Sequence, residues 1–253
     1  MKIGLRGGHS INCRGAVGLR DEYLQMQDLY KHVRDILVTN GHIVIDCNSN
    51  ANTVNGELTE GTNKANSNNL ELYLTLHMNS YNGNAYGTEA WVYSTSRKSY
   101  SVAERLVNNY EKLGFHNRGV KVSTSLHDLR ASVAPGIVFE TCFCDSEKDI
   151  NIWSPTPWEK LSRYICNAID PNIPLEETAE KEEGYVVTDY LGKQIPNYDG
   201  AEVVGVIKSY FKDVDKVYVR GNSIGMWLET QLLPMNKCKE LKERLGSFFD
   251  SIR

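Results

Sequence analysis

The sequence predicts an α/β fold, with a mostly parallel sheet covered by helices, followed by a small α+β domain. Apolar runs with strand character alternate with segments of helical periodicity along residues 1–169, and this alternation is typical of a parallel sheet. Residues 136–143, GIVFETCF, are nearly all apolar, as expected for a strand that is covered on both faces. Beyond an acidic stretch at 170–184, shorter strands and helices follow.

The first elements follow in order from the amino terminus. Residues 2–7, KIGLRG, predict a strand. Residues 21–40 predict a helix because their apolar side chains recur at helical spacing, and Gly41 is expected to end it. Residues 42–47, HIVIDC, predict the next strand. A polar stretch then leads to a helix expected at 59–69.

The alternation continues through the middle of the chain. Two further strands are expected at 71–79 and 87–94. Ser101 and Glu104 have the spacing of a capping box, which predicts the start of a helix that runs to Leu113.

The first domain is expected to end with a helix and a linker. Residues 156–159, TPWE, form a second capping-box pattern with proline at the first helical position, and they predict a helix to residue 169. Residues 170–184 contain two prolines, six acidic residues and one lysine. Such a segment has too little apolar surface to offset its ordering entropy. We therefore expect domains at 1–169 and 185–253, joined by an acidic linker at 170–184.

The second domain reads as strand, helix, strand, strand, helix, strand. This order is compatible with a ferredoxin-like split fold. The domain contains no histidine, and it offers no catalytic set. The strands are expected near 184–189, 216–221, 223–232 and 247–252, and the helices near 200–212 and 235–245.

The charge and hydrophobicity of the sequence argue against two classes of partner, nucleic acids and membranes. The 253 residues are 41% hydrophobic and carry a net charge of −4, which argues against nucleic acid because phosphate binding needs a basic face. No apolar run reaches membrane-spanning length, and the first residues lack the apolar stretch of a signal peptide. We expect synthesis in the cytoplasm and no membrane partner. The six cysteines are irregularly spaced, as expected for reduced and mostly buried thiols.

Four polar residues converge on one rim of the predicted sheet. His9 follows the first strand, His77 lies at the end of another and Glu140 lies toward the end of a third. Glu22 lies at the start of the first helix, which begins on the same side of the sheet. Ligands of open α/β sheets bind beyond the carboxyl ends of the strands. Two histidines and one carboxylate can bind zinc and leave a position for water, while the remaining glutamate can accept a proton.

Structural roles are the alternative for each of these residues. His9 could be an ordinary loop histidine, and Glu22 a first-turn acid favoured by the helix dipole. Burying an unpaired carboxylate inside the apolar run around Glu140 would cost roughly several kcal/mol of folding free energy, because the charge would lose its hydration without gaining a partner. The structural alternative for Glu140 is an ion pair with one of three basic residues: Arg118, Lys121 or Arg130. Cys13, close to His9, could join the metal site or disturb it.

Three stretches resemble a known family of hydrolases. They begin with GLRGGHS and RGAVGLRDE, continue with LYLTLHMNSYNGNAYGTEAWVYS, and end with RGVKVSTSLHDLRASVAPGIVFETCFCDSEKDINIW. Their sequence and order resemble the zinc-dependent N-acetylmuramoyl-L-alanine amidases, and the two-domain layout is similar to clostridial phage endolysins. The resemblance covers nearly all of the first domain.

The resemblance implies a reaction and a role for each residue. His9, Glu22 and His77 would be the zinc ligands, and Glu140 the catalytic carboxylate. The reaction would be hydrolysis of the amide between N-acetylmuramic acid and L-alanine in bacterial peptidoglycan. Asn79 and Arg130 are candidates for substrate binding; Asn79 could instead end its strand, and Arg130 could balance Glu140.

The resemblance also implies where the protein acts. The second domain would bind a wall polymer, mediate homo-oligomers, or do both. The enzyme would act on the cell wall after release, as a phage endolysin or as an enzyme that lyses its mother cell.

Three other functions remain open at this stage. The same four residues could serve a zinc peptidase that cuts within the stem peptide. Cys142 or Cys144 could act with His127 as a cysteine hydrolase. The chain could also be a wall-binding protein without activity.

Overall fold

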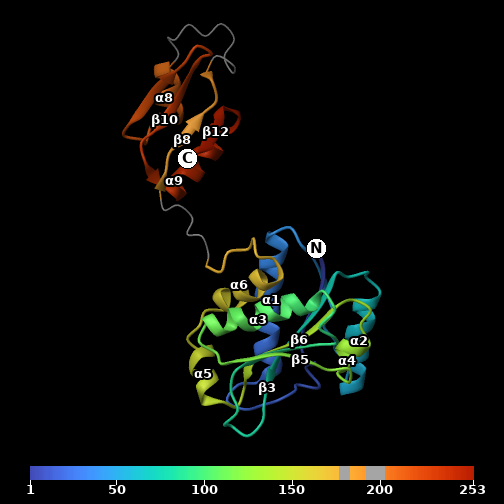
Figure 1. The fold of residues 1–253 in the computed structure, drawn as a ribbon. Helices are drawn as coiled ribbons and strands as arrows, with labels where there is room; N and C mark the ends of the chain where they lie inside the picture. The colour runs from blue at the N-terminus through green and yellow to red at the C-terminus, as the bar shows by residue number, and fades with distance from the viewer. Residues whose placement is uncertain (177–182, 192–202) are drawn as a thin grey trace. The chain divides into compact units, whose positions relative to one another are not determined.

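The chain forms two compact units, Met1–Glu177 and Thr178–Arg253. The computed structural model describes residues 1–176, 183–191 and 203–253 (Figure 1). The division between the units falls within the predicted acidic linker, of which residues 177–182 lie outside the described part of the chain. Residues 200–202 of the helix expected near 200–212 also lie outside it.

The first unit is built on a six-stranded sheet. The four strands β2, β1, β3 and β6 are parallel, whereas β4 is antiparallel to β6 and β5 is parallel to β4. The prediction of a mostly parallel sheet is therefore confirmed. In sheet order the strands are β2 (Ile43–Asp46), β1 (Lys2–Gly7), β3 (Leu72–Asn79), β6 (Gly136–Phe143), β4 (Thr88–Val92) and β5 (Asn117–Val122).

Helices cover both faces of this sheet. The helices of the first unit are α1 (Glu22–Thr39), α2 (Val54–Asn66), α3 (Ser99–Lys112), α4 (His127–Arg130), α5 (Glu147–Trp153) and α6 (Trp158–Ile169). Figure 1 shows α1, α3 and α6 on one side of the sheet and α2 and α4 on the other. In β3, Leu72, Leu74 and Leu76 join the large core under α1, α3 and α6, whereas Tyr73 joins the smaller core beside α2. His77 follows the odd positions, so it shares the α2 face.

Several expected helix starts are wrong, and the reasons are local. Helix α2 begins at Val54, not at 59, because the Thr53 side chain caps it by accepting from Gly56 N. Both expected capping boxes fail. The Ser101 hydroxyl donates to a backbone carbonyl of the preceding turn, as does the hydroxyl of Thr156, and neither caps the helix that follows it.

Three elements were not expected at all. They are the edge strand β5 and the short helices α4 and α5. Strand β5, NRGVKV, is partly exposed along most of its length and has no clear apolar alternation. It is recognisable only from its pairing with β4.

The second unit has a four-stranded antiparallel sheet in the order β12-β8-β10-β9, and β11 pairs with β7. Its strands are β7 (Glu183–Gly184), β8 (Val186–Thr188), β9 (Val217–Gly221), β10 (Met226–Thr230), β11 (Leu233–Pro234) and β12 (Phe249–Ile252). Among its described residues, the helices are α8 (Val203–Tyr210) and α9 (Met235–Leu245), followed by the short 3-10 helix η1 (Gly246–Phe248). Val206 of α8 and Leu241 of α9 pack with Val186 and Leu228 of the sheet in one apolar core.

Two further findings concern the length of the helices and the state of the cysteines. Within the described residues, every helix is too short or too polar to span a bilayer. All six cysteines are free thiols, and all but Cys13 are buried.

Candidate metal centre

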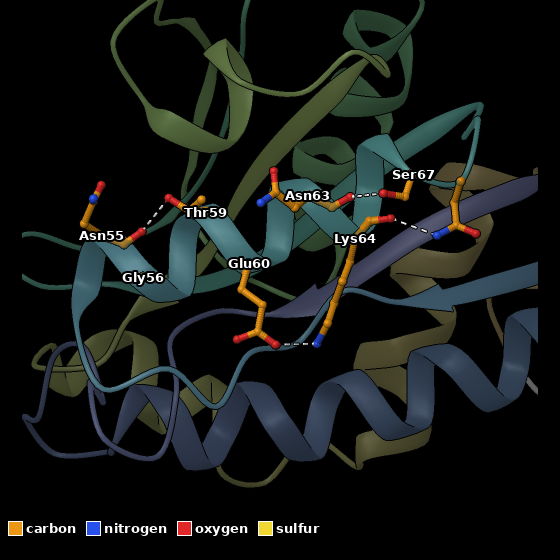
Figure 2. A pocket seen from close by; sticks show the side chains of 8 residues that line it. Asn55, Gly56, Thr59, Glu60, Asn63, Lys64 and Ser67 are labelled. Carbon is orange, nitrogen blue, oxygen red and sulfur yellow. Dashed lines mark hydrogen bonds and ion pairs between the residues drawn. The ribbon is translucent and has the colours of Figure 1, made fainter.

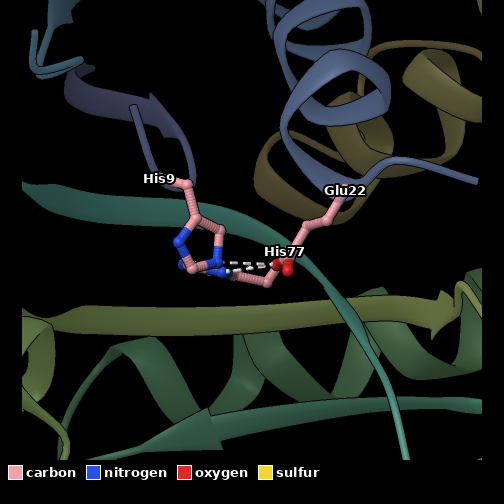
Figure 3. A group of neighbouring side chains, drawn as sticks. All are labelled: His9, Glu22 and His77. Atoms are coloured by element: carbon pink, nitrogen blue, oxygen red, sulfur yellow. Dashed lines mark hydrogen bonds and ion pairs between the residues drawn. The ribbon is translucent and has the colours of Figure 1, made fainter. Parts of the chain in front are cut away.

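Three side chains from distant parts of the sequence meet at the carboxyl edge of the sheet. His9 follows β1, Glu22 is the first residue of α1 and His77 lies near the end of β3. Figure 3 shows both imidazole rings beside the Glu22 carboxylate. Glu22 Oε1 lies 3.1 Å from His9 Nε2 and 3.0 Å from His77 Nδ1. One ligand atom of each residue lies within 4.8 Å of the other two.

The local sequence explains why these residues meet. Strands β1 and β3 are parallel neighbours, with Gly7 beside Leu76, so the residues that follow each strand reach the same edge. The Asp21 side chain caps α1 by accepting from Leu24 N at 3.1 Å, and this fixes Glu22 in the first helical turn.

Glu22 is also held by backbone groups. Its Oε1 accepts a hydrogen bond from Met78 N at 3.1 Å, and its Oε2 accepts one from Ala16 N at 2.8 Å. The carboxylate is therefore buried and fixed between β3 and the loop that precedes α1.

Glycines make room for the rings. A Cβ atom on Gly8 would lie 2.3 Å from His77 Cε1, and one on Gly15 would lie 2.4 Å from both Glu22 Oε2 and a ring carbon of His9. Gly15 also has a φ of +71°, which disfavours any other residue. His9 itself has a φ of 70°, a conformation that is uncommon outside glycine and is often found at functional sites.

The charges in this cluster are strongly coupled. Burial alone would lower the pKa of His9, but the Glu22 and Glu57 carboxylates raise it to about 10. Burial alone would raise the pKa of Glu22, but hydrogen bonds from His77 and His9 hold it well below its ordinary value. Two imidazole rings therefore lie within hydrogen-bonding distance of the same buried carboxylate oxygen, Glu22 Oε1. Two nitrogen donors and one oxygen donor around a common point are a donor set that suits zinc.

Glu140 lies beside this cluster. It is the neighbour of His77 in the register of β3 and β6. Burial raises the pKa of Glu140 to about 7. Its Oε2 is buried, and within the described residues it has no hydrogen-bond partner. The site thus contains a free carboxylate oxygen next to the three ligand candidates.

The family of the chain follows from its sequence. Residues 3–171 match the N-acetylmuramoyl-L-alanine amidase family, designated Amidase_3. The chain belongs to this family. The matched residues include the six strands of the first unit and all four residues of the site.

Relatives of this amidase-family chain occur in clostridia and bacilli. It is 33% identical over 228 residues to an uncharacterized protein of Clostridium perfringens, covering 86% of this chain and 66% of that protein. An uncharacterized 38.4 kDa protein of C. perfringens is 30% identical over 198 residues, covering 72% and 58%. The chain thus spans less than two thirds of the length of these relatives. A sporulation-specific N-acetylmuramoyl-L-alanine amidase of Bacillus subtilis is 26% identical over 184 residues, covering 71% of each chain.

Solved structures show the same fold. The catalytic domain of the CD27L endolysin targeting Clostridium difficile aligns with a TM-score of 0.63 and 28% identity, covering 67% of this chain and 96% of that one. The catalytic domain of the amidase CwlV from Paenibacillus polymyxa aligns with a TM-score of 0.60 and 19% identity, covering 69% and 99%.

Glu89 is a buried carboxylate of this amidase fold that the sequence analysis did not assign. It lies opposite Glu140 in the register of β4 and β6. Its Oε2 lies 2.5 Å from Arg118 Nε and 2.6 Å from Lys121 Nζ. The structural alternative for Glu140, an ion pair with Arg118 or Lys121, is therefore wrong, because Glu89 binds both cations. Residues 87–89, Gly-Thr-Glu, lie within one of the stretches that resemble the amidases, but only the register of β4 with β6 shows that this glutamate lies opposite Glu140.

The two candidates for substrate binding lie in different settings. Asn79 ends β3 and donates from Nδ2 to Glu89 Oε1 at 3.2 Å. Arg130 is exposed at the end of α4. Cys13 is half-buried and is not part of the metal-ligand cluster within the described residues.

The thiols do not suit nucleophilic catalysis. Burial raises the pKa of Cys142 well above its ordinary value and that of Cys144 to about 11. Reactive cysteines instead have a lowered pKa and some exposure. The cysteine-hydrolase alternative is therefore disfavoured.

A separate depression lies on the outer face of α2 and contains none of the predicted site residues (Figure 2). Most of its polar side chains form hydrogen bonds or ion pairs with groups of α2 itself. The Glu60 and Lys64 side chains form an ion pair, and the Thr59 and Ser67 hydroxyls donate to helix carbonyls. This surface therefore offers no convergent set of free polar groups.

Proposed function

We propose that this chain hydrolyses the amide between N-acetylmuramic acid and L-alanine in bacterial peptidoglycan. One observation carries the proposal. The donor atoms of His9, Glu22 and His77 surround a common point, and the unpaired oxygen of Glu140 lies on the adjoining strand. This arrangement occurs in a chain whose first 171 residues match the amidase family almost throughout.

The three residues would hold zinc through His9 Nε2, a Glu22 carboxylate oxygen and His77 Nδ1, which are the atoms that face one another. When bound, zinc lowers the pKa of a coordinated water toward neutrality and polarises the substrate carbonyl. Glycines at 8 and 15 leave the space that these side chains need, and Glu22 is fixed by two backbone N–H groups.

Glu140 would move the proton. Without zinc, burial raises the pKa of Glu140 to about 7, and bound zinc would lower it from there, so the carboxylate would be ionised and able to accept a proton at neutral pH. Its free Oε2 would accept the proton of the attacking water and then deliver it to the nitrogen of the leaving L-alanine. The surrounding apolar strand keeps bulk water from that oxygen.

Digestion of purified peptidoglycan tests this proposal. We expect mass spectrometry to show stem peptides with a free amino-terminal L-alanine. A cut within the stem peptide would instead indicate the zinc-peptidase alternative. Glu140→Gln should lower the rate by about 10²–10⁴-fold, the usual contribution of a general base. Glu104→Gln, an exposed acid on α3, is the matched control and should keep the wild-type rate.

We further propose that the enzyme is a phage endolysin that acts on the wall of a Gram-positive host after release from the cytoplasm. The likeness to an endolysin catalytic domain targeting C. difficile supports this proposal. The second unit would bind a wall polymer and mediate homo-oligomers, while Asn79 and Arg130 would contact substrate. The test is sedimentation of full-length Glu140→Ala protein with purified walls. Binding that is lost when wall polymers are stripped from the peptidoglycan supports the targeting role, and equal binding to stripped walls contradicts it.

We also propose a ferredoxin-like fold for the second unit. The support is its sheet order, in which β10 separates β8 from β9 although α8 lies between those two strands in the sequence. A crystal structure of the full chain tests this assignment.

A further inference from the structure

His9 has a carboxylate on each side. Its Nε2 faces Glu22 Oε1 at 3.1 Å, whereas its Nδ1 faces Glu57 Oε1 at 3.6 Å. The two ring nitrogens therefore have different tasks. Nε2 points toward the cluster with His77, and Nδ1 points toward the first turn of α2.

Glu57 is held in place from two directions. Its backbone N–H donates to Thr53 O at 2.9 Å at the start of α2, and its side chain is buried. Its second oxygen, Oε2, is bonded to Nη2 of Arg6. Glu57 can therefore turn little, and its free oxygen remains directed at His9.

Arg6 anchors this arrangement from β1. It is fully buried, and its Nη1 lies 3.2 Å from Asp128 Oδ2 on α4. The buried cation thus binds two carboxylates, Glu57 and Asp128, of which only Glu57 faces His9. Desolvation offsets much of the attraction within a buried ionic network, so this network is weak evidence for added stability and is compatible with a role at the metal centre.

The chemistry of a metal-binding histidine supplies that role. A neutral imidazole that binds a metal through one nitrogen carries its proton on the other nitrogen. A carboxylate that accepts this proton fixes the tautomer, orients the ring and makes the ligand nitrogen more basic. His9 needs such support because its backbone lies in the left-handed region, in the loop that follows β1.

We propose that Glu57 is a positioning residue for the metal centre. It holds His9 in the tautomer that carries the proton on Nδ1 and leaves Nε2 free for the metal, and Arg6 holds Glu57. The inference rests on the proposed zinc site, and it assigns a function to a residue that touches neither the metal nor the substrate.

Zinc affinity tests the inference, measured by competition with a fluorescent chelator on the full-length protein. Glu57→Gln should bind zinc about 10- to 100-fold more weakly than wild type, the usual effect of losing such a partner. Asp128→Asn is the matched control, because it removes the other carboxylate on Arg6 and leaves Glu57 beside His9. It should keep the wild-type affinity. Circular dichroism and thermal melting of the zinc-free proteins check that both variants fold.

Three outcomes overturn the inference. Equal zinc affinity of Glu57→Gln and wild type would show that Glu57 does not support the ligand. Equal weakening in both variants would show that the Arg6 network acts only through stability. If wild type itself binds no zinc, the proposed function fails and this inference fails with it.

A second measurement serves if Glu57→Gln does not fold. Nitrogen-15 NMR of histidine-labelled, zinc-loaded wild-type protein reports which ring nitrogen carries the proton. We expect a protonated Nδ1 and a metal-bound Nε2 for His9. A His9 ring with the opposite tautomer would contradict the proposal.

Discussion

Glu140→Gln should stabilise the zinc-free protein, and the gain should grow with pH. Burial raises the pKa of Glu140 from 4.5 to about 7. Between these two values the unfolded chain loses its proton first, so the free energy of unfolding falls as pH rises. Above about 7 the loss is complete. Glutamine has the same shape and no charge, and it escapes this penalty.

The magnitude follows from the pKa. Since one pKa unit corresponds to about 1.4 kcal/mol, the raised pKa of Glu140 lowers the free energy of unfolding by about 3 kcal/mol at pH 8 and by about 1 kcal/mol at pH 5. We expect Glu140→Gln to recover about these amounts. The substitution should at the same time lower the rate of peptidoglycan hydrolysis by about 10²–10⁴-fold, so that stability and activity change in opposite directions.

Urea denaturation in the presence of a chelator measures this effect for wild type and Glu140→Gln at both pH values. Glu104→Gln, which removes an exposed carboxylate, controls for a general effect of charge and should show no gain that grows with pH. If Glu140→Gln gains no more stability at pH 8 than at pH 5, the carboxyl group is not buried and unpaired in the way described.

Four other predictions follow from the site. Hydrolysis by wild type should decline as the pH falls through the pKa of Glu140, because protonated Glu140 cannot accept a proton; bound zinc should place this decline below the value of about 7 that the carboxyl group has without the metal, and a rate that stays constant down to pH 4 would contradict this role. A chelator should abolish activity and added zinc should restore it, whereas a thiol-blocking reagent should leave activity unchanged because Cys142 and Cys144, the thiols of the cysteine-hydrolase alternative, are buried. His77→Ala should abolish zinc binding in equilibrium dialysis, and retention of one zinc per chain would show that the ion lies elsewhere. Gly8→Ala should lower both zinc affinity and melting temperature, because its Cβ would overlap the His77 ring at 2.3 Å; wild-type values for both would show that the loop adapts freely.

The sequence was most informative about the site because ligands of a parallel sheet bind at the carboxyl ends of its strands. His9 and His77 could be found because each lies at the end of an apolar strand, and parallel neighbours end at the same edge. Glu22 could be added because a helix that follows such a strand begins at that edge. Glu140 was noticeable as a carboxylate in an otherwise apolar run.

Long-range partners could not be predicted in the same way. Glu57 lies in a polar stretch, and nothing near it in the sequence shows that it faces His9 or binds Arg6. Glu89 lies in a predicted strand, yet its partners Arg118 and Lys121 come from β5, an edge strand that the sequence did not predict. Both assignments depend on the register and packing of elements that lie far apart in the chain.

Local signals also failed where side chains had two choices. The hydroxyls of Ser101 and Thr156 fit a capping-box pattern, but each bonds to a preceding carbonyl instead. Serine and threonine readily make either bond. Such residues therefore locate a helix end only approximately.

Anomalous diffraction at the zinc absorption edge, from crystals grown with zinc, would test the metal centre most directly. A single strong peak should lie about 2 Å from His9 Nε2, a Glu22 oxygen and His77 Nδ1, the usual ligand distances of zinc. A peak at another set of residues, or none in zinc-soaked crystals, would contradict the account and leave the chain with the amidase fold but without its chemistry.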